Sequence, residues 1–334
     1  MKPGEEQETR LMWPAVSAST VRAARCPQQR SRRVNQVGGD MTDYAIDLHT
    51  HSTASDGLYA PRDLVQQARA AGVRVLALTD HDSTEGVTEA AEAAAELGID
   101  FIPGIEINTE TPAGEVHMLG YFLHYQQEAF QQALRTLRDA RQRRGQRMVE
   151  LLHEQGIAIR WERVRELAKG AVGRPHVAQA LVEAGYAQSI EEAFARYLSK
   201  GCPAYVPRYK LSPQDAVRLI VSARGLPVIA HPLELPGPEI LRQWLPELRA
   251  LGLVGLEVYY GPYTPEQEEL LLSLAHQFDL IPTGGSDYHG PGIHPTPLGG
   301  HPVPAASVAR LKEAAASRSR QTPPPFKLPE PAAD

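Results

Sequence analysis

The chain has 334 residues, of which 42% are hydrophobic and 22% charged, and its formal net charge is −6. This length and composition suit one large or two modest globular domains, and the negative charge disfavours binding to long duplex nucleic acid. Cys26 and Cys202 stand far apart and form no CxxC pair, so we expect no disulfide framework and a reducing, cytoplasmic compartment. No apolar run approaches the about 20 residues of a membrane helix, so no membrane partner is expected.

Both ends of the chain are expected to lie outside the folded domain. Residues 1–40 contain several arginines but no continuous apolar stretch, so they predict a disordered extension rather than a signal peptide. Met41 precedes the first strand-like run and would be a natural start. Residues 317–334 are rich in Ser, Arg and Pro, which predicts a disordered tail. The domain is therefore expected to span residues 41–316.

Seven apolar runs of strand length occur within this domain, and helix-like runs separate several of them. Helices are expected to begin at Pro61 and Pro265, because proline favours the first helical turn. Such alternation is typical of a parallel α/β sheet or barrel, and seven strands indicate an incomplete barrel. The runs are 44–49, 74–79, 101–107, 116–122, 226–231, 254–259 and 280–283.

The alternation breaks at about 126–205, which we interpret as a helical insertion between barrel strands. Its predicted helices are 129–152, 160–168, 176–184 and 190–198. The first helix carries an arginine at every third position, and at about 3.6 residues per turn such a row drifts around the helix. We therefore interpret the row as a solvated surface rather than an anion-binding face. Its members are Arg135, Arg138, Arg141, Arg144 and Arg147.

Histidines and carboxylates gather at the ends of the strand-like runs. The carboxyl ends of the strands form the active-site face of an α/β barrel, so these side chains are expected to converge. Residues i and i+2 of an extended segment point the same way, so His49 and His51 can grip one ion together. The clusters are His49-Thr50-His51 with Asp56, Thr79-Asp80-His81-Asp82, Glu106, His117, Ala230-His231-Pro232 and Ser286-Asp287-Tyr288-His289.

These clusters predict a metal site. Imidazole and carboxylate ligands together suit Zn, Mn or Fe, and Glu106 could bridge two ions about 3.5–4 Å apart, as in two-metal phosphoryl-transfer sites. Asp47, Asp80 and Glu257 are expected to orient ligands rather than bind ions. The remaining histidines are expected at the surface (His124, His153 and His276) or in loop packing (His294 and His301).

Taken together, these motifs resemble the polymerase and histidinol phosphatase (PHP) superfamily, from Tyr44 to about Pro291. The resemblance implies a distorted seven-stranded (β/α) barrel with a helical insertion and a trinuclear metal centre. It rests on Asp47-Leu48-His49-Thr50-His51, Ser55-Asp56-Gly57, Thr79-Asp80-His81-Asp82, Gly104-Ile105-Glu106, Glu115-Val116-His117, Ala230-His231-Pro232 and Gly285-Ser286-Asp287-Tyr288-His289. The ligands that it implies are His49, His51, Asp56, His81, Glu106, His117, His231, Asp287 and His289.

The insertion is similar to that of small bacterial phosphoesterases that act on 3′,5′-nucleoside bisphosphates or on the 5′ ends of short RNA. The hypothesis is that two or three Mn, Fe or Zn ions supply a metal-bound hydroxide that hydrolyses such a small phosphorylated substrate. Arg174 is expected to clamp a phosphate, and His176 to act as a general acid or a phosphate contact. Alternatively, both residues only begin a helix. Arg208 and Lys210 could hold a second phosphate.

Three other functions remain open. A histidinol-phosphate phosphatase would share the ligands that the resemblance implies. A metal-dependent amidohydrolase would use a similar barrel, although no lysine that could be carboxylated stands in any motif. A metal-binding module without activity is disfavoured, because no ligand position is missing. The oligomeric state is not indicated.

Overall fold

The computed structural model describes residues 45–112, 114–168, 172–207, 209–235 and 237–329. The expected N-terminal extension, Met41 and Arg208 lie outside these residues. Within them, no helix is both long enough and apolar enough to cross a membrane.

Seven strands form one sheet, in which each strand pairs with its neighbour in chain order. The backbone N–H of Leu48, just after the first strand, donates to the carbonyl of Gly284 in the last strand at 3.2 Å. The two edges of the sheet therefore meet, and the expected distorted barrel of seven strands is confirmed. The strands are β1 (Ala45–Asp47), β2 (Val73–Leu78), β3 (Asp100–Thr111), β4 (Gly114–Tyr121), β5 (Leu226–Ile229), β6 (Gly255–Tyr260) and β7 (Ile281–Gly285).

The fourth strand corrects the expectation of an all-parallel barrel, because β4 runs antiparallel to both β3 and β5. β3 ends at Thr111 and β4 begins at Gly114, and so short a connection cannot hold the crossover of a dozen or more residues that parallel pairing needs. His117 pairs with Asn108, just beyond Glu106 in β3. The beginning of β4 therefore lies where the parallel strands end.

Helices α1, α2, α7, α8, α9 and α10 accompany the sheet. Local signals define their ends: proline stands in the first turn of α1 and α9, and the Thr264 hydroxyl accepts a hydrogen bond from the Gln267 N–H at the start of α9. Gly98 ends α2 in a left-handed conformation, with φ of 66°. The bounds are α1 Pro61–Ala70, α2 Val87–Leu97, α7 Pro213–Ser222, α8 Pro238–Leu251, α9 Pro265–Gln277 and α10 Ala305–Ser319.

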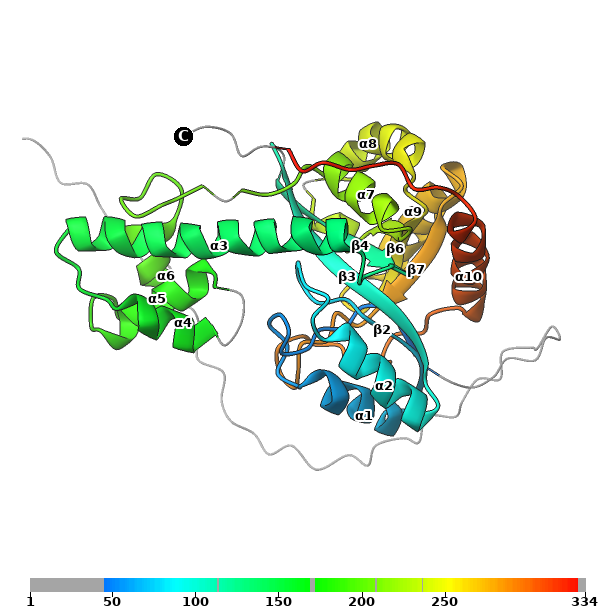
Figure 1. Ribbon diagram of the computed structural model, residues 1–334, viewed down its shortest axis with the longest axis horizontal. Coiled ribbons are helices and arrows are strands. Elements are labelled where there is room, and N and C mark those ends of the chain that lie inside the picture. Colours follow the sequence, from blue (N-terminus) through cyan, green and yellow to red (C-terminus); the bar gives the residue numbers. More distant parts are fainter. Residues whose placement is uncertain (1–44, 113, 169–171, 208, 236, 330–334) are drawn as a thin grey trace, which may run out of the picture. The chain divides into compact units, whose positions relative to one another are not determined.

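The helical insertion lies between β4 and β5, as the sequence predicts. Figure 1 shows α3 as its longest helix, with α4, α5 and α6 near one end. The first half of α3 buries Phe130 and Leu134 in the barrel core, whereas its second half buries Met148 and Leu152 in a separate core with the other insertion helices. One helix thus belongs to two hydrophobic cores. The elements are α3 (Glu128–Glu154), α4 (Trp161–Ala168), α5 (Arg174–Glu183), α6 (Ile190–Ala193) and a π-helical turn (Phe194–Leu198).

The segment after Ala316 differs from the disordered tail that its composition predicts. Helix α10 continues to Ser319, and Phe326 and Leu328 pack against the barrel core. The Tyr209 hydroxyl donates a hydrogen bond to the carbonyl of Pro329. Residues 317–329 therefore fold onto the barrel, while residues 330–334 lie outside the described part of the chain.

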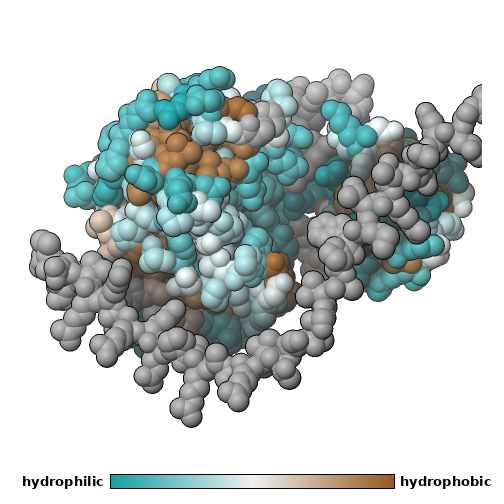
Figure 2. All heavy atoms as spheres, turned by 180° about the vertical axis from the view of Figure 1, so that it is seen from behind, coloured by the Kyte–Doolittle hydropathy of each residue, from teal (hydrophilic) through white to brown (hydrophobic). Residues whose placement is uncertain are grey.

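The side of the molecule seen in Figure 2 is largely hydrophilic, with a smaller hydrophobic area. Leu58 and Ile293 are large hydrophobic side chains of the described part that are exposed to solvent. Both belong to loops next to strand ends that carry candidate ligands.

Candidate metal centre

Glu106 of β3 lies at the centre of the candidate site, and its side chain is buried. Its Oε1 atom lies 2.9 Å from Nδ1 of His117 and 3.1 Å from Nε2 of His231. Its Oε2 atom faces a different set of imidazoles, at 3.3 Å from His49, 3.2 Å from His51 and 3.0 Å from His81. A carboxylate whose two oxygens face two sets of ligands has the arrangement of a bridge between two ions.

Asp287 adds a second carboxylate on the side of His49 and His51. Its Oδ1 atom lies 3.3 Å from Nε2 of His49 and 3.1 Å from Nε2 of His51. Possible ligand atoms of His49, His51, Glu106 and Asp287 all lie within 4.8 Å of one another. As expected from their i, i+2 spacing, the two histidines present their side chains to the same place.

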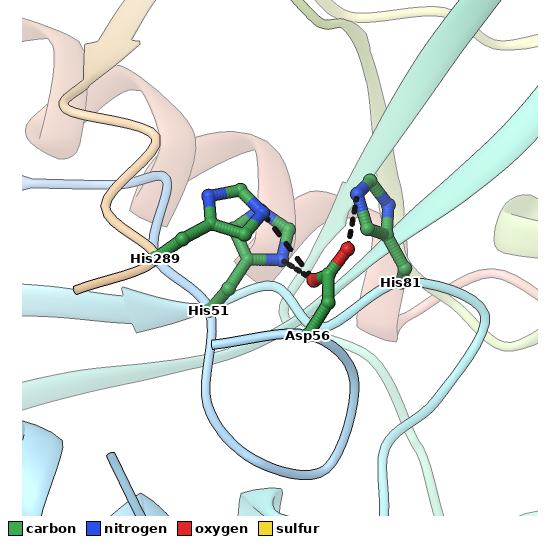
Figure 3. A group of neighbouring side chains, drawn as sticks. All are labelled: His51, Asp56, His81 and His289. Carbon is green, nitrogen blue, oxygen red and sulfur yellow. Dashed lines mark ion pairs between the residues drawn. The ribbon is translucent and has the colours of Figure 1, made fainter. Parts of the chain in front are cut away.

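A further group surrounds Asp56 in the loop after β1 (Figure 3). Its Oδ1 atom lies 3.3 Å from Nε2 of His289 and 3.8 Å from Nδ1 of His51, and its Oδ2 atom lies 3.7 Å from Nε2 of His81. These four residues form another group whose ligand atoms lie within 4.8 Å of one another. All nine residues that the resemblance implies as ligands thus converge on adjoining groups around Glu106, His51 and Asp287.

Several atoms of this cluster lack the partners that buried polar atoms need. Nε2 of His49, both ring nitrogens of His51, Oε2 of Glu106 and Oδ1 of Asp287 are buried without a hydrogen-bond partner within the described part of the chain. Such atoms cost free energy unless something satisfies them. A divalent cation would satisfy nitrogen and carboxylate oxygen together, so these residues fit metal ions.

The charges in the cluster are strongly coupled. Burial raises the pKa of Glu106, but the imidazoles of His81, His49 and His117 outweigh this effect and hold the pKa well below its usual range. Burial lowers the pKa of His231, but hydrogen bonds with Glu106 and Glu234 outweigh it and raise the pKa to about 10. Without metal, His231 therefore keeps a proton that a bound cation would displace.

Glu257 of β6 has the supporting role that we expected. Its Oε1 atom lies 3.0 Å from Nδ1 of His49, and its Oε2 atom accepts the backbone N–H of His231 at 2.7 Å. This contact leaves Nε2 of His49 directed at Glu106 and Asp287, as carboxylates behind ligand histidines commonly do.

Asp47 and Asp80 support the site in a different way from the one expected. Asp47 accepts hydrogen bonds from the backbone and hydroxyl of Ser286 at 2.9 and 2.6 Å. Asp80 accepts 2.7 Å hydrogen bonds from the backbone and hydroxyl of Ser52 and from the hydroxyl of Ser55. Both carboxylates thus fix the loops that carry Asp56 and Asp287, rather than contacting an imidazole.

Arg174 and His176 begin α5 and do not belong to these groups of candidate ligands. Nδ1 of His176 accepts the backbone N–H of Gly173 at 3.0 Å, which is the helix-start role that the sequence left open. The guanidinium of Arg174 lies 5.6 Å from the ring centre of Phe194. Burial lowers the pKa of His176, and Arg141 lowers it further while Asp56 opposes the shift. His176 therefore lies in the electrostatic field of both.

The arginine row of α3 corrects the expectation of a solvated surface. Arg138 and Arg141 line a cavity of about 690 Å³ together with His81. Arg141 and Arg144 line a smaller cavity of about 160 Å³ together with Arg174 and Lys210. The middle of the row thus borders the candidate site. Arg135 and Arg147, at the two ends of the row, are exposed and pair with glutamates of the same helix.

His294, which the sequence analysis placed in loop packing, lies beside two of the candidate ligands. A ligand nitrogen of His294 lies within 4.8 Å of possible ligand atoms of Asp287 and His289. His301, from the same loop, lies instead 2.7 Å from Oε1 of Glu268 in α9. The HxxxxH spacing between His289 and His294 is the only local signal, and it is too common to identify a ligand.

Comparisons with known proteins agree with this geometry. Residues 47–206 match the family model described as PHP domain. A 3′,5′-nucleoside bisphosphate phosphatase of Chromobacterium violaceum is 35% identical over 254 residues, covering 74% of this chain and 88% of that protein. A 5′-3′ exoribonuclease of Haemophilus influenzae is 36% identical over 247 residues, covering 73% of this chain and 90% of that protein.

A solved structure from Bifidobacterium adolescentis, assigned as a metal-dependent phosphoesterase, has a TM-score of 0.68 and 36% identity, and covers 82% of this chain and 97% of that one. Sequence relatives, fold and a cluster of candidate ligands therefore agree, and the chain belongs to the PHP family of metal-dependent phosphoesterases.

Proposed function

We propose that this phosphoesterase hydrolyses a phosphate ester of a small nucleotide, with two or three Mn, Fe or Zn ions at the candidate metal centre. The observation that carries the proposal is the central carboxylate of Glu106, whose two oxygens face separate sets of imidazoles. The ions would be held by His49, His51, Asp56, His81, Glu106, His117, His231, Asp287 and His289.

Bound divalent ions would lower the pKa of a water molecule and offset the charge that develops on the phosphate oxygens. The chain's own residues hold and orient the ligands for this task. Glu257 fixes the ring of His49, and Asp80 holds the loop that presents Asp56. The strand ends thus supply a preorganised site, which reduces the reorganisation that the reaction would otherwise need.

The cavities beside the metal centre support a nucleotide substrate. The larger cavity extends from His81 along Arg138 and Arg141, and Arg141 also borders the smaller cavity that contains Arg174. Guanidinium groups bind phosphate through paired hydrogen bonds. A substrate with one phosphate at the ions could therefore place a second phosphate near Arg141 and Arg174. A 3′,5′-nucleoside bisphosphate or the 5′ end of a short RNA has this chemistry.

The other candidate functions fit these features less well. Histidinol phosphate has a single phosphate and would not use the arginines that line the smaller cavity. An amidohydrolase that uses a carboxylated lysine would need a lysine among the ligands, and no lysine stands in the sequence motifs that carry the candidate ligands. Lys210 instead lies 2.5 Å from Glu115.

The test is phosphate release by metal-loaded protein from adenosine 3′,5′-bisphosphate, a short 5′-phosphorylated RNA, adenosine monophosphate and histidinol phosphate. Activity on the first two should be highest and should disappear after chelation. Glu106→Gln serves as a matched variant that keeps the side-chain shape while removing the charge. Clear preference for histidinol phosphate would refute the substrate assignment, and activity that survives chelation and Glu106→Gln would refute the metal centre.

A further inference from the structure

His294 lies in the loop after β7 and closes a stack of three imidazoles. Its ring centre lies 4.8 Å from that of His289, with an angle of 20° between the planes. His289 also stacks on His51 at 4.0 Å and 15°, and Figure 3 shows these two rings lying over each other next to Asp56. The stack brings His294 to the edge of the metal centre.

Asp287 connects His294 to that centre through its second carboxylate oxygen. Oδ1 of Asp287 faces His49 and His51. Oδ2 points away from them, accepts a hydrogen bond from the Tyr260 hydroxyl at 3.1 Å, and lies 3.8 Å from Nδ1 of His294. The two oxygens of this carboxylate can therefore serve both the ligands around His49 and the position next to His294.

We propose that His294 is a further metal-binding residue of this centre, where it acts together with Asp287 and His289. Ligand atoms of these three residues lie within 4.8 Å of one another. The inference rests on the metal centre proposed above but assigns a residue that lies outside its nine ligands. His294 would hold an ion on the side of Asp287 that faces away from His49.

The position of the ring favours ligation over packing. The side chain of His294 is 29% exposed, so an ion could reach it from the solvent. The neighbouring Ile293 side chain, by contrast, is 47% exposed and turns to solvent. A loop that only needed apolar packing would be expected to bury the isoleucine and expose the imidazole.

The experiment is a calorimetric titration of metal-free full-length protein with Mn²⁺, comparing the wild type with His294→Ala. His301→Ala is the matched control, because it removes an imidazole from the same loop that contacts Glu268 instead. His294→Ala should weaken the binding of one ion at least about tenfold, since even residues that only support ligands change metal affinity by about 10–100-fold. His294→Asp, which restores a ligand oxygen, should recover part of the affinity.

The outcomes separate this inference from the proposed function. Wild-type protein that binds no Mn²⁺ would refute the metal centre itself. Wild-type binding with unchanged stoichiometry and affinity in His294→Ala would refute only the role of His294, and a raised KM without a change in metal binding would identify a substrate contact instead. Thermal melting of both metal-free proteins checks the fold, and equal midpoints assign any lost affinity to the missing ligand.

Discussion

Oε1 of Glu257 lies 3.0 Å from Nδ1 of His49, and both side chains are fully buried. The contact fixes which nitrogen of the imidazole faces the metal centre, since Nε2 is left 3.3 Å from both Glu106 and Asp287. A buried carboxylate in this position also raises the basicity of the ligand nitrogen.

Glu257→Gln should therefore weaken metal binding by about 10–100-fold while the nine candidate ligands stay in place. The amide keeps the shape and a hydrogen bond but loses the negative charge that supports His49. Metal titration measures the affinity, and Glu247→Gln at an exposed position of α8 is the control. Equal affinities in the two variants would show that Glu257 only fills space.

Metal binding should respond to pH through the imidazoles. The pKa of His49, His51 and His81 is raised: burial lowers each of them, but neighbouring carboxylates outweigh it. These groups stabilise the metal-free fold fully below their unfolded pKa of about 6.5, and that contribution is lost as the pH rises through the folded values. Binding a cation displaces the same protons, so metal affinity should rise with pH.

The measurement is the melting temperature with chelator and with Mn²⁺ from about pH 6 to about pH 9. The metal-free protein should lose stability over this range, and the stabilisation by Mn²⁺ should grow. At acidic pH the metal-free protein should lose stability a second time. Burial raises the pKa of Asp56 and of Asp287, but neighbouring histidines outweigh this effect and hold both pKa values below the usual range. A metal effect that shrinks with rising pH would contradict this account.

The candidate ligands could be proposed from the sequence because their signals are local. Strand periodicity places the side chains of His49 and His51 on the same side of the backbone. The other candidate ligands stand at or near the ends of strand-like runs. The direction of β4 was not predicted, because an apolar run of strand length does not show whether the strand lies parallel or antiparallel to its neighbours. His117 nevertheless lies beside Glu106, because the beginning of an antiparallel strand meets the ends of its parallel neighbours.

The features that the sequence missed depend on packing between distant segments. A row spaced by three residues does not reveal that α3 packs in two different cores, so it could not show that Arg141 borders the site while Arg147 faces solvent. Likewise, the proline-rich composition around Phe326 and Leu328 predicted disorder, although these two apolar side chains pack against the barrel core.

Arg141 and Arg174 should matter most for substrates with two phosphates. Arg141→Ala and Arg174→Ala should each lower kcat/KM for adenosine 3′,5′-bisphosphate by about 10–10³-fold, since each removes one or two charge-assisted hydrogen bonds of about 1.5–3 kcal/mol. An aryl phosphate should lose less, because it has no second phosphate to anchor.

Steady-state kinetics with both substrates measures this difference. Arg147→Ala is the control, because this arginine of α3 pairs with Glu150 and Glu154 on the exposed side. Equal losses for the bisphosphate and the aryl phosphate would mean that the arginines support the fold or the ions rather than a second phosphate.

The C-terminal segment should stabilise the domain, contrary to its composition. Removing residues 321–334 uncovers the part of the barrel core that Phe326 and Leu328 contact and breaks the hydrogen bond from Tyr209 to Pro329. Partial exposure of two apolar side chains should cost about 1–3 kcal/mol, and a domain of this size loses roughly 2–4 °C in melting temperature per kcal/mol.

Phe326→Ala should reproduce part of this loss of stability, whereas Lys327→Ala, a neighbouring change to an exposed side chain, should not. Thermal unfolding of the three variants against the full chain measures the effect, and a truncated protein that melts with the wild type would show that the segment does not contribute to stability in solution.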